Sequence, residues 1–397
     1  MRAAPNQEEV RRLNLGTLLR HVHFRGPTSR AELTASMGLN RSTIGALTSD
    51  LIAAGLVVEE VPRDHGRAGR PSLVVRPLAE RVYVYAFSLE VDRIVAARVG
   101  LGGVVLDRRE LPRPRGERPA PKVVAPFAEF VRDAEKSVPA DALCVGSAAA
   151  VNAMVRKEDG TVRLCEAGAV DDAFAAAVAE ALGDTRGPLA PLEVRNGADL
   201  AALAEHGRGV AIGCDNVIYL YGDAGVSGGV IAGGRPMTGH GGYGGEVGHM
   251  VVNPQGRPCS CGSRGCWETE IGESALVRAS GRDGTGHAAV LAVVDAAARG
   301  DVMAQAALRQ VGDWLGFGVA NLVNIFNPEL VIFGGTLREV YLSSAAQVRG
   351  RLTRMALAAS REHVRLRTPS LGEDAALLGA ADLAFERLLA DPLDNAG

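Results

Sequence analysis

Apolar residues recur at helical spacing near the start of the chain. An i, i+3, i+4, i+7 stripe within 7–24 is formed by Leu15, Leu18, Leu19 and Val22. This spacing predicts one amphipathic helix. Gly26 and Pro27 follow and are expected to break it.

Two shorter helices are predicted next. Ser29 and Glu32 have the Ser-x-x-Glu spacing of a capping box, which opens a helix ending at Gly38. Asn40 can cap a third helix that has one apolar face. Its apolar positions are Ile44, Leu47 and Leu51. Two short helices joined by a tight, glycine-containing turn form the helix-turn-helix pattern.

The outer face of the third helix carries side chains that fit a major groove and reach base edges or phosphates. They are Arg41, Ser42, Thr43, Ala46 and Ser49. Any three-helix bundle has polar outer positions, so the next segment carries more weight. Two strand-like runs, Leu56–Glu60 and Ser72–Arg76, flank a glycine- and arginine-rich stretch that holds Arg67 and Arg70. Such a tip suits a wing in the minor groove. A winged helix-turn-helix DNA-binding domain is therefore predicted over 1–80.

From Arg81 onward, strand-like and helix-like runs alternate. The strand-like runs are Val82–Leu89, Ile94–Val99, Ala142–Ala148, Val217–Tyr221 and Leu330–Phe333. The helix-like runs lie at 172–182, 198–206, 288–298 and 303–326. This alternation predicts an α/β body over 81–397. The proline- and arginine-rich segment 112–126 is interpreted as an exposed connector without a function.

Charge is distributed unevenly between head and body. The first 77 residues carry 11 Arg, no Lys and 7 acidic residues, whereas the chain as a whole has a net charge of −3. A basic head on an acidic body suggests a polyanionic partner, although the excess is small. No apolar run approaches the roughly 20 residues that span a bilayer, and the N-terminus lacks the apolar core of a secretory signal. A cytoplasmic protein without a membrane partner is expected.

A cluster of metal-ligand residue types lies in the segment 249–268. His249, Cys259, Cys261 and Cys266 supply four ligands suited to tetrahedral Zn²⁺. Because protein would fill all four positions, one structural zinc ion per chain is expected rather than a hydrolytic one. The alternative is three buried thiols in a glycine-rich loop.

Longer motifs around this cluster resemble the signature of the ROK family of repressors, open reading frames and sugar kinases. They are the glycine-rich segment 233–244, the short segments 245–250, 259–262 and 265–268, and the late strand within 323–335. The helix-turn-helix head is similar to that of the family's repressor branch. The resemblance implies an actin-like, two-lobed sugar-kinase fold for 81–397 and the same four zinc ligands.

The resemblance also implies sugar contacts at Asn196, Glu246, His249 and Glu268. Carboxylates accept hydrogen bonds from neighbouring sugar hydroxyls, and an amide both donates and accepts. His249 can give one ring nitrogen to zinc and leave the other for a hydroxyl. Taken alone, Glu246 and Glu268 are interpreted as a pair of solvated loop charges, but their place beside the zinc ligands favours sugar contacts.

Two departures from the family's kinases argue against phosphoryl transfer. Gly197 stands where the kinases carry the aspartate that acts as general base, and Asp199, two residues later, is expected to point elsewhere. The kinases' Asp-x-Gly-Gly-Thr phosphate loop corresponds here to Phe87–Arg93, which has no glycine and includes Glu90. The body is therefore predicted to be a catalytically inactive, degenerate sugar kinase.

These features together predict a DNA-binding transcriptional regulator controlled by a sugar or a sugar derivative. A homodimer or homotetramer reading a two-fold symmetric operator is expected, since helix-turn-helix dimers bind paired half-sites. Two alternatives stay open. One is an active sugar kinase with a DNA-binding head, and the other is a regulator whose body is a ligandless module for dimerisation or partner docking.

Overall fold

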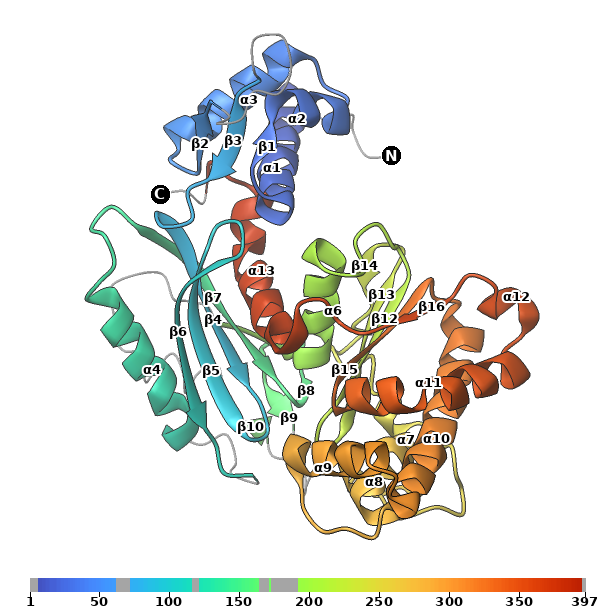
Figure 1. The fold of residues 1–397 in the computed structure, drawn as a ribbon. Helices are drawn as coiled ribbons and strands as arrows, with labels where there is room; N and C mark the ends of the chain where they lie inside the picture. Colours follow the sequence, from blue (N-terminus) through green and yellow to red (C-terminus); the bar gives the residue numbers. More distant parts are fainter. Residues whose placement is uncertain (1–5, 62–71, 116–120, 164–170, 173–191, 395–397) are drawn as a thin grey trace.

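The computed structural model describes residues 6–61, 72–115, 121–163, 171–172 and 192–394. It forms a small head above two larger lobes (Figure 1). The head contains α1 (Gln7–Arg25), α2 (Arg30–Met37) and α3 (Arg41–Ala53), with the short strands β1 (Thr28–Ser29), β2 (Val57–Glu60) and β3 (Val74–Pro77). The strands form one sheet in the order β1-β3-β2.

Local capping signals begin the helices of the head where the sequence predicts. Ser29 and Glu32 form the reciprocal capping box of α2. The side chain of Asn40 accepts from the Thr43 N–H at 2.8 Å and begins α3. The three predicted helices and the two strands of the wing are thereby confirmed. The wing tip, with Arg67 and Arg70, lies outside the described residues.

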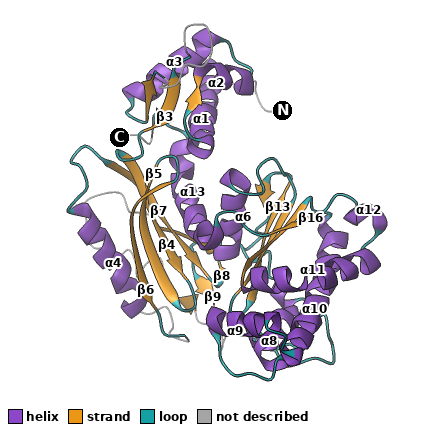
Figure 2. Ribbon diagram, viewed as in Figure 1, coloured by secondary structure: helices purple, strands orange, loops and turns teal. Residues whose placement is uncertain are grey.

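The first lobe is built on a five-stranded sheet in the order β11-β7-β4-β5-β6. Its strands are β4 (Val82–Leu89), β5 (Arg93–Gly100), β6 (Val104–Pro112), β7 (Leu143–Val151) and β11 (Leu192–Asn196). Helix α4 (Pro121–Glu135) covers one face (Figure 2). A small sheet of β8 (Met154–Val155), β9 (Val162–Arg163) and β10 (Asp171–Asp172) lies at one end. The helix expected at 172–182 lies almost entirely outside the described residues.

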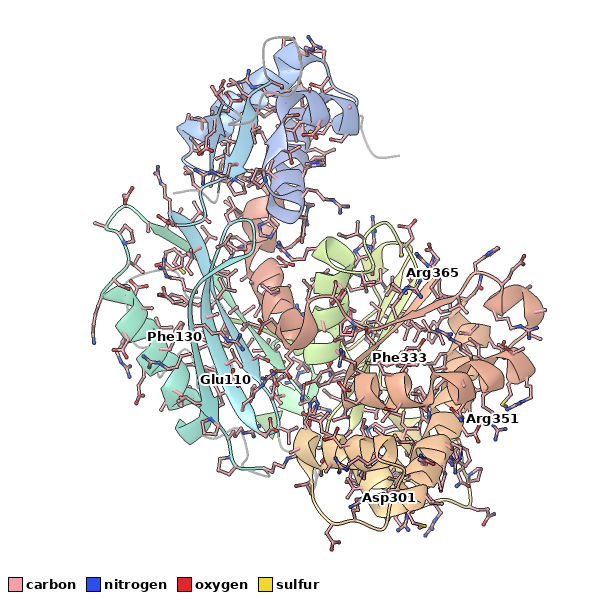
Figure 3. The ribbon with its side chains drawn as sticks, viewed as in Figure 1. Glu110, Phe130, Asp301, Phe333, Arg351 and Arg365 are labelled. Carbon is pink, nitrogen blue, oxygen red and sulfur yellow. The ribbon has the colours of Figure 1, made fainter. Side chains whose placement is uncertain are left out.

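The second lobe repeats this arrangement. Its sheet has the order β14-β13-β12-β15-β16, formed by β12 (Val217–Gly222), β13 (Val226–Ala232), β14 (Arg235–Pro236), β15 (Leu330–Gly335) and β16 (Arg365–Arg367). In both lobes the first two strands form an antiparallel hairpin and the fourth pairs in parallel with the first. Figure 3 shows Phe333 inside this lobe, and Arg365 on the edge strand β16.

Helices fill the space around and between the sheets. Helices α7 (Trp267–Ile271), α8 (Glu273–Ala279), α9 (Gly286–Ala298), α10 (Val302–Phe326), α11 (Thr336–Met355) and α12 (Ala358–Arg361) belong to the second lobe, with the 3-10 turns η1 (Val247–His249) and η2 (Gly372–Asp374). Two further helices, α6 (Gly197–Arg208) and α13 (Ala375–Ala390), pack against each other. Helix α6 lies on β12 and β13, whereas α13 lies on β4 and β7 and also contacts α1.

The head shares its hydrophobic core with the first lobe. Buried side chains of α1, including Leu18 and Val22, form one cluster with Val84 of β4 and with Phe385 and Leu389 of α13. The end of the chain therefore returns to support its beginning (Figure 1).

Candidate functional site

The predicted metal ligands lie together between η1 and α7. The ligand atoms of His249, Cys259, Cys261 and Cys266 all lie within 4.8 Å of one another. The loop that carries them depends on Gly265, which has a positive φ of 70°. A Cβ there would lie 1.6 Å from the carbonyl oxygen of Asn253, so only glycine fits.

The donor set and its spacing fit a tetrahedral metal ion. The Cys261 and Cys266 sulfurs are 3.6 Å apart, and His249 Nδ1 is 3.6 Å from the Cys259 sulfur. With a Zn–S distance of about 2.3 Å, ligand atoms on a tetrahedron are separated by roughly 3.8 Å. The cluster can therefore hold a metal ion, and Nδ1 is the imidazole nitrogen that faces it.

Glu268 lies in the first turn of α7, directly against this cluster. Its Oε1 is 2.9 Å from the Cys259 sulfur and 3.6 Å from His249 Nδ1, while Oε2 accepts from the Val226 N–H at 3.4 Å. The neighbouring Trp267 is fully buried and donates its indole N–H to the Trp314 carbonyl, which fixes the start of α7. Glu268 thus connects the metal loop to the β12–β13 hairpin.

Asn196 is a buried residue at the end of β11, where α6 begins. Its Oδ1 accepts from the Ala198 N–H at 2.8 Å, and its Nδ2 donates to the Ala153 carbonyl at 3.1 Å. The amide therefore caps α6 and joins it to β8, since Ala153 directly precedes that strand. One lone pair of Oδ1 is left for a further donor.

Asp199 faces Glu246, which the sequence interpretation did not anticipate. A Cβ on Gly245 would lie 3.9 Å from Asp199 Oδ1, so this carboxyl lies beside the turn that carries Glu246. Burial, with the charge of Glu246, raises the pKa of Asp199 to about 7, and burial also raises the pKa of Glu246. The expectation that Asp199 points away from the position of the kinases' base stays a prediction, because this contact locates the carboxyl only relative to Glu246. The i, i+3 spacing between Asn196 and Asp199 was the signal available for it, because residues three apart share one helix face.

Asn152 occupies the space beside Gly197. A Cβ at Gly197 would lie 3.0 Å from Asn152 Oδ1, and Asn152 Nδ2 donates to Asp223 Oδ2 at 3.4 Å. An amide from the first lobe therefore reaches the first hairpin turn of the second lobe next to this glycine. An amide cannot accept a proton from a hydroxyl as a carboxylate can.

Charged side chains also fill the space between the first hairpin turns of the two lobes. In the first lobe, Glu90 accepts from Arg93 Nε at 2.6 Å, and burial raises its pKa. In the second, Asp223 lies 3.4 Å from Arg115, and burial raises its pKa to about 7. Arg115 also donates to the buried Glu273 at 3.2 Å. The interpretation of 112–126 as an exposed connector without a function is wrong for Arg115, which joins the two lobes, and for 121–126, which belong to α4.

The predicted DNA-facing residues share one end of α3. Arg41, Ser42 and Ala46 are exposed and Thr43 is half-buried. Ser42 also donates to the capping Asn40 at 2.6 Å. Among the described residues, no helix is both long and apolar enough to span a membrane.

Comparisons with known proteins identify the family to which this architecture belongs. The sequence pattern that defines the ROK family matches residues 85–387. The xylose repressor of Bacillus subtilis is 26% identical over 386 residues, covering 97% of this chain and 98% of the repressor. The glucokinase of Streptomyces coelicolor is 33% identical over 214 residues, which is 49% of this chain and 68% of the kinase.

Solved structures give the same fold. A ROK family transcriptional regulator, a homologue of the E. coli MLC protein, superposes with a TM-score of 0.75 at 24% identity, covering 98% of this chain and 99% of the regulator. A ROK glucokinase from Streptomyces griseus, in complex with glucose and AMPPNP, has a TM-score of 0.61 at 25% identity and covers 76% of this chain and 99% of the kinase. The body thus has the two-lobed sugar-kinase fold. The chain belongs to the ROK family, among its transcriptional regulators.

Proposed function

We propose that this regulator binds operator DNA through residues 1–80 and that a sugar bound between the lobes of residues 81–397 changes its affinity for DNA. The observation that carries the proposal is the extent of the likeness. The repressors match the whole chain, head included, whereas the glucokinases match about half of it. A head of three capped helices with a wing suits DNA, and a body with a sugar-kinase fold suits a sugar.

The sugar pocket is proposed to use Asn196, Glu246, His249 and Glu268, with Asp199 as a fifth member. Near neutral pH, Asp199 is partly protonated, so this carboxyl can donate to a hydroxyl while Glu246 accepts from one. D-xylose is the first ligand to test, because relatives that match 97% of this chain are named xylose repressors.

Zinc is proposed as the occupant of the His/Cys cluster. His249, Cys259, Cys261 and Cys266 would hold it, and four protein ligands would leave no position open for water. A bound ion would fix the loop and orient the His249 ring, whose Nε2 is then the nitrogen available to a ligand.

The body is proposed not to transfer phosphate. Gly197 and its neighbour Asn152 provide no general base at the position where the kinases carry one, and Asp199 is assigned to donating a hydrogen bond to the sugar. In the two hairpin turns, Glu90 and Asp223 are paired with Arg93 and Arg115, so these two cations are engaged within the protein rather than with a phosphate. Such a base contributes about 10²- to 10⁴-fold to the rate, so its loss alone would be severe.

DNA contacts are proposed for Arg41, Ser42, Thr43 and Ala46 in the major groove, and for Arg67 and Arg70 in the minor groove. A homodimer or homotetramer would present two heads to a two-fold symmetric operator, with half-sites about one helical turn apart or a multiple of it.

The test begins by selecting genomic DNA fragments that the purified protein retains, followed by footprinting. Binding is then titrated with and without D-xylose and D-glucose, and a coupled ATP assay is run on both sugars. The proposal predicts a symmetric footprint, a sugar-dependent dissociation constant and no turnover near the 1–10³ s⁻¹ typical of enzymes. Retained DNA that no sugar affects would favour a ligandless body, and rapid ATP turnover would favour a kinase.

A further inference from the structure

Three side chains from three distant parts of the chain form a buried polar network beneath the head. They are Arg208 at the end of α6, Asp382 on α13 and His23 on α1. Asp382 Oδ1 is 3.0 Å from His23 Nε2, and its Oδ2 accepts from Arg208 Nε at 3.2 Å. The side chains of His23 and Asp382 are 0% and 2% exposed.

Backbone groups complete this network and fix the histidine ring. The Gly102 N–H donates to His23 Nδ1 at 3.0 Å, and His23 Nε2 lies 3.0 Å from Asp382 Oδ1 and 2.8 Å from Arg208 Nη2. A neutral ring with its proton on Nε2 satisfies the contacts with Gly102 and Asp382. Arg208 Nη1 donates to the Gly102 carbonyl at 3.1 Å and to the His23 carbonyl at 3.4 Å. Arg208 therefore holds both the backbone of α1 and the carboxylate that orients its histidine.

The packing around the network leaves little free space. A Cβ on Gly207 of α6 would lie 2.6 Å from the Phe24 ring of α1, and the Arg208 guanidinium lies 5.0 Å from the centre of that ring. On the other side, a Cβ on Gly16 of α1 would lie 2.7 Å from the Leu389 carbonyl of α13. Close-packed interfaces of this kind shift as units rather than deform gradually.

The opposite end of α6 lies at the proposed sugar pocket. Asn196 caps the helix there, and Asp199 faces Glu246 from its first turn. Helix α6 has 12 residues, so about 18 Å of stiff backbone separates the pocket from Arg208.

We propose that α6 transmits occupancy of the sugar pocket to the DNA-binding head, with Arg208 as the positioning residue through which it holds α1. This inference rests on the proposed function, because it concerns how the same pocket regulates DNA binding. A ligand that draws Asp199 and Glu246 together moves the start of α6, and Arg208 carries that movement to His23 and Phe24. The covalent connection between β3 and β4 then serves as a tether.

The first arm of the test measures the ratio of operator dissociation constants with and without D-xylose. Wild type is compared with Arg208→Lys, Arg208→Met and the control Arg20→Ala, which removes an exposed ion pair with Glu386 across the same helices. We expect wild type and Arg20→Ala to share a ratio within the 5- to 150-fold typical of coupled sites. The Arg208 variants should approach a ratio of one while their D-xylose affinity stays within about twofold of wild type. A full ratio in Arg208→Lys with unchanged sugar affinity overturns the inference.

The second arm needs no sugar, so it separates failure of the inference from failure of the proposed function. Hydrogen exchange of residues 18–25 is measured in Asp199→Asn, in Arg208→Lys and in the double variant. We expect Asp199→Asn to change this exchange by about twofold or more in the wild-type background. In the Arg208→Lys background Asp199→Asn should have no such effect, as for residues coupled through a shared backbone shift. The inference is wrong if Asp199→Asn leaves exchange in α1 unchanged, or if it changes that exchange as much in the Arg208→Lys background as in wild type. This holds even where D-xylose regulates DNA binding. If D-xylose does not change the operator dissociation constant of wild type, the proposal that this sugar regulates DNA binding is wrong. The exchange measurements then still decide whether α6 connects the pocket to α1.

Discussion

The two ends of α6 bury charge in opposite ways. At the pocket end, Asp199 and Glu246 face each other as like charges, and burial raises the pKa of both. At the head end, the Asp382 carboxylate is matched by Arg208 and His23, and hydrogen bonds from both lower its pKa despite burial. Buried charges of opposite sign form a rigid contact. Buried like charges repel each other, so the site is stabilised when it accepts hydrogen bonds from hydroxyl groups or takes up a proton. Helix α6 thus connects a site that can respond to a ligand with a contact that holds α1 of the head in place.

Loss of the proposed zinc ion should have the largest effect, at the pocket end of α6. Cys261→Ser deletes one ligand of the cluster against which Glu268 lies, so the variant should lose the ion and its fixed loop. A ligand present at 1,000 times its dissociation constant contributes about 4 kcal/mol. The thermal midpoint should therefore fall by about 8–16 °C. Elemental analysis and calorimetry measure both quantities.

Cys144→Ser provides the matched control, because Cys144 is buried in the first lobe outside the cluster. It should keep about one zinc ion per chain. Freshly purified wild type without zinc would show that the cluster is not a zinc site.

Breaking the matched charges at the head end should have the next largest effect. Asp382→Asn leaves Arg208 buried without its carboxylate, and losing one partner of a buried pair costs about 3–5 kcal/mol. Glu386→Gln, one helical turn further along α13, removes only an exposed pair with Arg20 and should cost less than about 1 kcal/mol. Denaturant unfolding of both variants measures the difference. Equal costs would mean that the buried network adds no more than the exposed pair.

Sequence alone predicts the features of this molecule that are formed by residues close together in the chain. The Ser29 capping box and the Asn40 cap are set by residues three positions apart, and the metal ligands lie close together in the chain. For these, local spacing determines the structure.

Features formed by residues far apart in the chain could not be predicted in this way. Arg115 meets Glu273 across 158 positions, and His23 meets Asp382 across 359. At the sequence level His23 is only a polar residue at the end of an apolar stripe, and nothing near it indicates an acidic partner. Their contacts follow from the duplicated sheets and from the return of α13 to the first lobe.

Neutralising Asp199 should have a smaller, stabilising effect. Because its pKa is raised from 3.8 to about 7, its contribution is present at low pH and is lost as pH rises through 7, where the buried group must ionise beside Glu246. Asp199→Asn removes that cost and should raise the thermal midpoint at pH 8 by about 2–4 °C, corresponding to about 1 kcal/mol. At pH 5 the stabilisation by the substitution should be smaller than at pH 8, because the folded wild-type carboxyl is still protonated at pH 5. A lower midpoint for the variant at pH 8 would mean that the ionised carboxylate has a cationic partner.

The smallest effect expected is a loosening of the head at mild acidity. Burial lowers the pKa of His23 below its ordinary 6.5, opposed by Asp382 and reinforced by the charges of Arg208 and Arg20. A chain with α1 detached takes up a proton more readily, so docking of α1 is fully stable above pH 6.5 and weakens as pH falls below it. The loss cannot exceed about 1.4 kcal/mol per pH unit for one proton.

Hydrogen-exchange protection of residues 18–25, corrected for intrinsic rates, should decline between pH 7.5 and 5.5. His23→Gln should abolish most of this dependence, whereas His21→Gln should retain most of it, since burial also lowers the pKa of His21 on the same helix but leaves its side chain half-buried. Unchanged pH dependence in His23→Gln would mean that another group controls docking.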